Sequence, residues 1–101
     1  MGEPRWNVLV TYDISTETLA GQRRLRRIAD VCLAYGQRVQ KSVFECTLTP
    51  TQYARFEQRL LRCIDEEEDR LRIYRLYGDR ERYLTTYGST TEIDLDEPLV
   101  I

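Results

Sequence analysis

Histidine is absent from this sequence of 101 residues, and cysteine occurs only three times, at Cys32, Cys46 and Cys63. The cysteines are widely spaced, and no two of them form a C-x-x-C pair. A zinc site uses histidine or closely spaced cysteine ligands, and a disulfide framework usually has an even set of cysteines, so the sequence disfavours both. We expect the three cysteines to be small buried side chains.

Long apolar runs and several common motifs are also missing. No hydrophobic stretch is long enough to cross a bilayer, and the first residues lack the basic-then-apolar order of a signal peptide, which favours a cytoplasmic protein. Neither a GxxxxGK[ST] loop nor a GxGxxG loop is present, which disfavours nucleotide sites of those types. Ser42 has no G-x-S-x-G surroundings and no histidine base, so a serine hydrolase is disfavoured as well.

Neither sign of charge is in large excess. Lys and Arg total 15 and Asp and Glu total 17, a net charge of -2, which argues against indiscriminate nucleic-acid binding but allows a local basic face. Basic residues gather in 22–41, and acidic residues gather in 65–69 and 92–97. The length and the hydrophobic content of 42% fit one globular domain over residues 1–101, with a loose lead-in at residues 1–5.

A buried strand is predicted at residues 6–14, which read W-N-V-L-V-T-Y-D-I. The aliphatic run at its centre and the Thr and Tyr after it favour extended structure. Asp13 places a single carboxylate at the C-terminal end of this strand, directly before a helix. The rest of the chain can be arranged around this acid.

A helix is predicted at residues 17–35, with Ser15 or Thr16 as its N-cap and Glu17 in its first turn. Gly21 should weaken its first turns, and Gly36 should end it. Apolar residues recur with helical spacing at Leu25, Ile28, Ala29 and Cys32.

The second half repeats the pattern of strand and helix. Residues 38–48 predict two short strands or one bent strand, with Lys41-Ser42 as a tight link or a bulge. The sequence T-P-T-Q at 49–52 is a strong helix start with a capping box, and this helix should end at the acidic turn 65–69. Its inner stripe is predicted at Tyr53, Phe56, Leu60 and Ile64. A last strand is predicted from Leu71 to Tyr77.

This order of elements predicts an α+β fold of the ferredoxin-like βαββαβ type, an antiparallel sheet with two helices on one face. The other face would leave Leu9, Tyr74 and Leu76 bare, which favours a homodimer that pairs through that face. The tail, residues 83–101, ends in apolar residues. We expect it to add an edge strand to the partner's sheet and so lock the dimer.

Asp13 is the first candidate for chemistry. Magnesium typically takes one or two protein carboxylates together with water and phosphate, and a two-fold axis would supply a second Asp13. Such a site could activate water for attack on a phosphodiester. The structural alternative is an ordinary aspartate that caps a helix or a turn.

The arginines of the first helix are the second candidate. The helix carries Arg23, Arg24, Arg26 and Arg27, and Arg38 and Lys41 follow it. They could contact a nucleic-acid backbone, because arginine is a good bidentate donor to phosphate; the alternative is a solvated helix face. Ser42 and Phe44 could touch a substrate, or could be a turn residue and a core residue.

These features together resemble the CRISPR-associated Cas-two proteins, from about Asn7 to the C-terminus. The resemblance lies in Y-D-I at the end of the first strand, R-V-Q-K-S-V-F-E-C at 38–46, L-R-I-Y-R-L at 71–76 and D-E-P-L-V-I at 96–101. The pieces are short, but their order and separation make the joint match specific.

The resemblance implies a ferredoxin-like homodimer that is a magnesium-dependent endonuclease on RNA or duplex DNA, with manganese as a substitute ion. It also implies a partnership with the CRISPR integrase that inserts new spacers. The family's metal-binding aspartate falls on Asp13. Its other site residues fall on Tyr12, Arg38, Ser42 and Phe44, and its helix arginines map less directly, to Arg24 and Arg27.

Three functions therefore remain open. The first is a metal-dependent phosphodiesterase in spacer acquisition. The second is a non-catalytic dimeric adaptor that bridges integrase subunits and grips duplex DNA, in which Asp13 would be dispensable. The third is a ferredoxin-like dimer that binds a small ligand.

Overall fold

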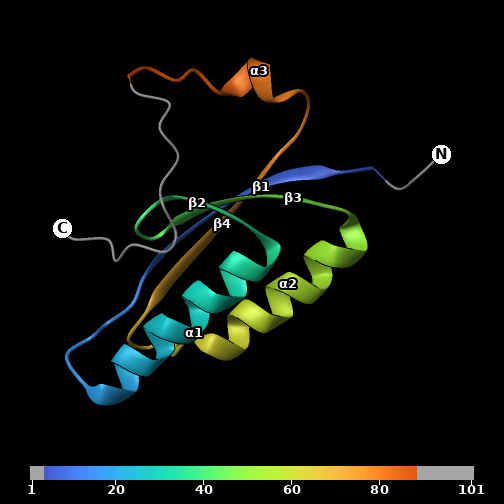
Figure 1. Cartoon of the computed structure of the whole chain (residues 1–101). Helices are drawn as coiled ribbons and strands as arrows, with labels where there is room; N and C mark the ends of the chain where they lie inside the picture. Colours follow the sequence, from blue (N-terminus) through green and yellow to red (C-terminus); the bar gives the residue numbers. More distant parts are fainter. Residues whose placement is uncertain (1–3, 89–101) are drawn as a thin grey trace.

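The computed structural model describes residues 4–88 and forms an α+β fold of the predicted type (Figure 1). Its elements are β1 (Trp6–Asp13), α1 (Leu19–Tyr35), β2 (Gly36–Gln40), β3 (Val43–Leu48), α2 (Pro50–Cys63), β4 (Arg70–Leu76) and the short α3 (Arg80–Tyr83). The four strands form one antiparallel sheet in the order β2-β3-β1-β4. Both long helices cover the same face of the sheet (Figure 1), which confirms the ferredoxin-like prediction.

The core lies between the sheet and the two long helices. Alternate residues of β1 point into it, so that Val8 and Val10 are completely or almost completely buried. From β3, Phe44 and Cys46 point to the same side. Helix α1 contributes Ile28, Val31 and Cys32, and helix α2 contributes Tyr53, Phe56, Leu60 and Cys63. All three cysteines are buried and free, as predicted.

The start of α1 differs from the sequence prediction. The helix begins at Leu19, and its N-cap is Thr18, whose side-chain oxygen accepts a hydrogen bond of 3.0 Å from the backbone N–H of Gly21. Ser15 and Thr16 therefore do not cap the helix, and Glu17 lies outside its first turn. These residues instead form the connection between β1 and α1, and this connection passes over the first turn of the helix at Gly21.

Gly21 is needed where this connection crosses the helix. A Cβ atom at this position would lie 1.9 Å from the backbone oxygen of Ser15. The sequence prediction that Gly21 weakens the helix did not include this role, in which the missing side chain allows the two segments to touch.

We expect Gly21→Ala to destabilise the protein by about 1–3 kcal/mol, the usual cost of overpacking. In an unobstructed helix the same change would stabilise by roughly 0.5–1 kcal/mol, so the sign of the effect is the test. Urea unfolding of Gly21→Ala and of the exposed control Arg23→Ala measures it. An increase in the free energy of unfolding for Gly21→Ala would contradict the close approach.

The start of α2 agrees with the prediction. The side chain of Thr49 accepts a hydrogen bond from Gln52 N–H, the side chain of Gln52 accepts one from Thr49 N–H, and Pro50 is the first helical residue. This reciprocal box satisfies two backbone donors that the first turn leaves without partners. Of the predicted inner stripe, Ile64 lies just past the helix as its C-cap and is half-buried.

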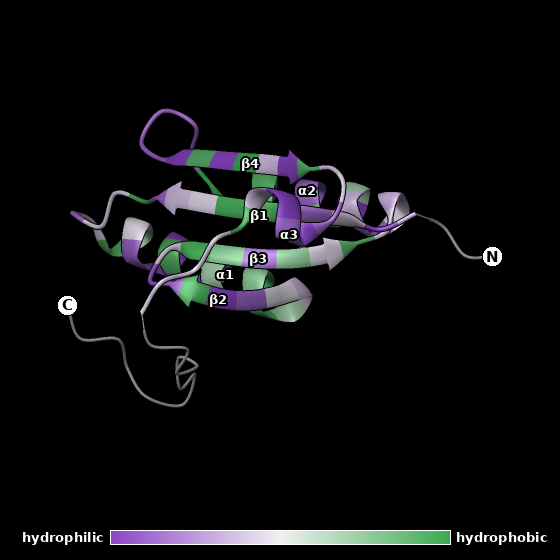
Figure 2. Cartoon of the chain, turned by 90° about the horizontal axis from the view of Figure 1, so that it is seen from above, coloured by the Kyte–Doolittle hydropathy of each residue, from purple (hydrophilic) through white to green (hydrophobic). Residues whose placement is uncertain are grey.

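The face of the sheet opposite the helices is partly covered by the chain that follows β4 (Figures 1 and 2). Residues 80–84 lie over a hollow whose lining includes Leu9 and Leu76, and Arg80 forms an ion pair of 2.6 Å with Glu45. Leu9 and Leu76 are therefore half-buried, whereas Tyr74 is 42% exposed, as predicted for a bare face. The predicted edge strand of the tail falls on residues 89–101, outside the described residues.

Candidate functional site

Asp13 lies at the C-terminal end of β1, as predicted, on the open face of the sheet. Its neighbour across the β1–β4 ladder is Arg70, and Thr11 pairs with Arg72. Paired residues of an antiparallel sheet project from the same face, so all four side chains share one side. These residues and Tyr12 line a shallow hollow.

The carboxylate of Asp13 is available for binding. The residue is exposed, and within residues 4–88 its side chain takes part in no hydrogen bond or ion pair. It does not cap α1, because Thr18 occupies that position. The structural alternative of a helix-capping aspartate is therefore wrong.

Tyr12 and Phe44 lie on the other side of the sheet, in the core. Their side chains stack with ring centroids 6.1 Å apart, and the Arg38 guanidinium lies 5.0 Å from the centroid of the Phe44 ring. Burial raises the pKa of the Tyr12 phenol, nearby Cys32 adds to the rise, and Arg38 opposes it. Tyr12 therefore stays neutral at physiological pH, and Phe44 is a core residue, which was the structural alternative.

Ser42 lies in the turn that joins β2 to β3, which was its structural alternative. Lys41 and Ser42 form a tight link between two short strands, which was one of the two predicted alternatives, and the register shift lies before them, between Arg38 and Gln40. The carbonyl oxygen of Ser42 accepts a hydrogen bond of 3.2 Å from the backbone N–H of Tyr12. This bond brings the turn next to the end of β1, one residue from Asp13.

The three predicted phosphate-binding arginines do not share the face of Asp13. Arg24 is held by Asp69, at 2.8 Å from its Nε and 3.3 Å from one terminal nitrogen. Arg27 lines a groove between the two long helices, and Arg38 lies over Phe44 on the helix side. The prediction that Arg24 is a free phosphate ligand is not supported, because its guanidinium already serves an internal ion pair.

Arg70 and Arg72 were not among the site residues that the sequence predicted. A signal was present, because strand alternation places them on one face with Tyr74. The pairing of β4 with β1, which was needed to bring them to Asp13, is a long-range contact that local spacing does not encode.

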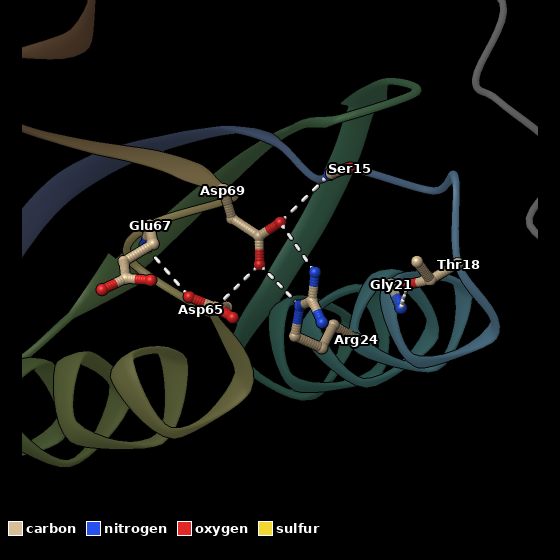
Figure 3. Close-up of polar contacts among 7 residues, drawn as sticks. All are labelled: Ser15, Thr18, Gly21, Arg24, Asp65, Glu67 and Asp69. Atoms are coloured by element: carbon tan, nitrogen blue, oxygen red, sulfur yellow. Dashed lines mark hydrogen bonds and ion pairs between the residues drawn. The ribbon is translucent and has the colours of Figure 1, made fainter.

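Asp69 is a third residue that the sequence prediction did not single out (Figure 3). Its buried carboxylate accepts hydrogen bonds from the backbone N–H of Ser15 at 3.0 Å and of Asp65 at 2.9 Å, in addition to those from Arg24. Burial by itself would raise the pKa of Asp69, but the hydrogen bonds from Arg24, Asp65 and Ser15 outweigh it and leave the pKa below its ordinary value.

This carboxylate ties together three segments that are far apart in the sequence. They are the connection after β1, the first turns of α1 and the acidic turn before β4. Because Ser15 is only two residues beyond Asp13, and Asp69 directly precedes Arg70, the contact fixes both strands at the end where the exposed acid lies.

Comparison with known proteins identifies the family. A family model described as CRISPR associated protein Cas2 matches residues 6–82. The chain belongs to the Cas2 family. This confirms the resemblance drawn from the sequence motifs.

Relatives with assigned names are similar over nearly the whole chain. A Cas2 protein of Moorella thermoacetica, named a CRISPR-associated endoribonuclease, is 54% identical over 93% of this chain and 98% of its own length. One of Halalkalibacterium halodurans, named a CRISPR-associated endonuclease, is 46% identical over 92% and 97%. The crystal structure of Streptococcus pyogenes Cas2 at pH 6.5 is 50% identical, covers 81% of this chain and 99% of that chain, and has a TM-score of 0.70.

A metal ion would find few ligands on one copy of this Cas2 chain. Among residues 4–88, no group of three or more His, Cys, Asp or Glu side chains could hold an ion. Asp13 fits a hard cation that takes one or two protein carboxylates and completes its shell with water and substrate phosphate. In the same described part of the chain, no helix has both the length and the apolar character that a membrane span requires.

Proposed function

We propose that this chain is a metal-dependent endonuclease that acts in CRISPR adaptation. The observation that carries the proposal is an exposed, unpaired carboxylate, Asp13, flanked by Arg70 and Arg72 in an open hollow. The names of the relatives, endoribonuclease and endonuclease, support the reaction class. The expected substrates are RNA or duplex DNA, and the expected compartment is the cytoplasm.

Asp13 would hold Mg²⁺, with Mn²⁺ as a substitute, together with Asp13 of a second copy of the chain. When bound, such a cation would polarise the phosphodiester and lower the pKa of a coordinated water. The side chains of the protein would bind the substrate and support the metal ligand. The arginines beside Asp13 would bind phosphate. The stacked side chains of Tyr12 and Phe44 would keep the end of β1 rigid from the helix side of the sheet.

A homodimer is part of this proposal. The exposed Tyr74 and the half-buried Leu9 and Leu76 lie on the open face of the sheet, and a second copy could cover them. Asp13 lies at the end of the same face, so pairing through this face could bring two such acids into a shared cleft.

Cleavage assays on the purified chain test the reaction. Labelled single-stranded RNA and duplex DNA are incubated with Mg²⁺, with Mn²⁺ and with EDTA. We expect cleavage of at least one substrate with either ion and none with EDTA. Cleavage of neither substrate under any of these conditions would overturn the endonuclease.

The adaptor remains the second candidate, because each chain offers one exposed carboxylate at this site while Tyr12 and Phe44 serve the core. A spacer-acquisition assay with the CRISPR integrase distinguishes the two roles. Normal acquisition by Asp13→Ala, together with failure of a chain that ends after Asp94, would favour the adaptor. Loss of acquisition by Asp13→Ala would favour catalysis.

A further inference from the structure

Two arginines stand beside Asp13 at the end of the β1–β4 ladder. Arg70 is its direct neighbour across the ladder, and Arg72 is the neighbour of Thr11, so both project from the face that carries the carboxylate. Both arginines are exposed. The side chain of Arg72 donates a hydrogen bond of 3.4 Å to the hydroxyl of Tyr74, which directs it along the face.

The two arginines of this hollow favour an anion beside the cation that Asp13 would hold. One carboxylate and two guanidinium groups give a local excess of one positive charge. Asp13 alone would repel a phosphodiester, whereas two guanidinium groups compensate that repulsion and offer bidentate donors that match phosphate oxygens. Neither arginine forms an ion pair within residues 4–88, so both groups are available to a ligand.

The spacing of the two arginines favours a strand of nucleic acid over a single phosphate. They are two residues apart on one strand, which separates their Cα atoms by about 6.6 Å along β4. This separation is similar to that between successive phosphates of an extended nucleic-acid strand.

We propose that Arg70 and Arg72 form a phosphate-binding pair that holds two successive phosphates of a nucleic-acid strand beside Asp13. The inference deepens the proposed endonuclease and rests on it for the identity of the ligand. It adds two strand arginines to the predicted arginines as residues that position the scissile segment.

Binding measured without turnover tests the pair. In an Asp13→Asn background, the Kd for a labelled single-stranded oligonucleotide is measured over a series of salt concentrations, with and without Arg70→Gln/Arg72→Gln. Each phosphate contact contributes about 0.7 to the slope of log K against log salt for a single strand, so we expect the slope to fall by about 1.4. The Kd at low salt should rise by tenfold or more.

The matched control is Arg55→Gln/Arg62→Gln, which removes the same charge from exposed positions of α2. Its slope should stay close to that of the background. The proposed phosphate-binding pair would be overturned if the salt slope fell equally in both double variants, or if it did not fall in Arg70→Gln/Arg72→Gln. Arg70→Lys/Arg72→Lys should restore most of the slope, because the charges return without the bidentate geometry.

These results are independent of the cleavage assays. If the wild-type chain cleaves nucleic acid but the slope does not change, the pair is wrong and the endonuclease stands. If the slope falls as expected while the wild-type chain cleaves nothing, the phosphate-binding pair stands and the endonuclease is wrong.

Discussion

Asp13→Asn is expected to lower the rate of metal-dependent cleavage by about 100-fold or more, in the range found when a preorganised electrostatic contact to the reacting group is removed. The amide keeps the shape of the side chain but carries no charge, so it holds a divalent cation weakly. Single-turnover cleavage measured over a series of Mg²⁺ concentrations reports the loss, and raising the Mg²⁺ concentration should recover part of the rate.

The control for this prediction is Asp30→Asn, which removes an exposed carboxylate from α1. Both variants should unfold within about 0.5 kcal/mol of the wild type, as exposed substitutions usually do. Undiminished cleavage by Asp13→Asn, or an equal loss in Asp30→Asn, would refute the role of Asp13.

Asp69→Ala is expected to destabilise the protein by about 3 kcal/mol, because it leaves a charged partner and two backbone N–H groups without their acceptor. The Asp69 side chain is completely buried, and the Arg24 side chain is only 18% exposed, so water can replace little of the lost contact. For a domain of this size each kcal/mol lowers Tm by about 4–8 °C. Urea and thermal unfolding at a fixed protein concentration measure the change.

The acidic turn supplies a matched control in Glu66→Ala, which removes an exposed carboxylate three residues away. Its stability should stay within about 0.5 kcal/mol of the wild type. A loss of less than about 1 kcal/mol in Asp69→Ala, or the same loss in Glu66→Ala, would contradict the role of the buried carboxylate.

The contribution of Asp69 should also depend on pH, with a definite sign. In the unfolded chain the carboxyl titrates near its ordinary value of 3.8, and in the folded protein its pKa is lower. The folded state therefore binds fewer protons, so the stabilisation is fully present above the unfolded pKa and is lost as the pH falls through the folded pKa. The difference in unfolding free energy between wild type and Asp69→Ala should therefore shrink below about pH 4.

Most of the fold could be predicted because its signals are local. The aliphatic run of β1, the capping box of Thr49 and Gln52, and the helical spacing of apolar residues each act within one element. The predicted start of α1 was wrong because it depends on a contact between distant parts of the sequence. Ser15 and Thr18 are both good capping residues, and the choice between them depends on Asp69, which lies 54 residues beyond Ser15 and takes its N–H.

The same distinction applies to the candidate site. Asp13 could be placed at the end of a strand from sequence, because the strand, the acid and the following helix are contiguous. Tyr12, Arg38 and Phe44 were named separately in the sequence prediction, and only the structure shows that they pack together on the helix side of the sheet.

The sequence by itself determined the order of the elements, the family and the position of one exposed acid at the end of the first strand, since each of these depends on neighbouring residues. The tertiary structure decided which charges accompany that acid. Pairing of β1 with β4 brings Arg70 beside Asp13, and the buried Asp69 holds the Arg24 guanidinium in an internal ion pair. Both outcomes depend on register and packing between segments more than 40 residues apart, which no local pattern of residues specifies.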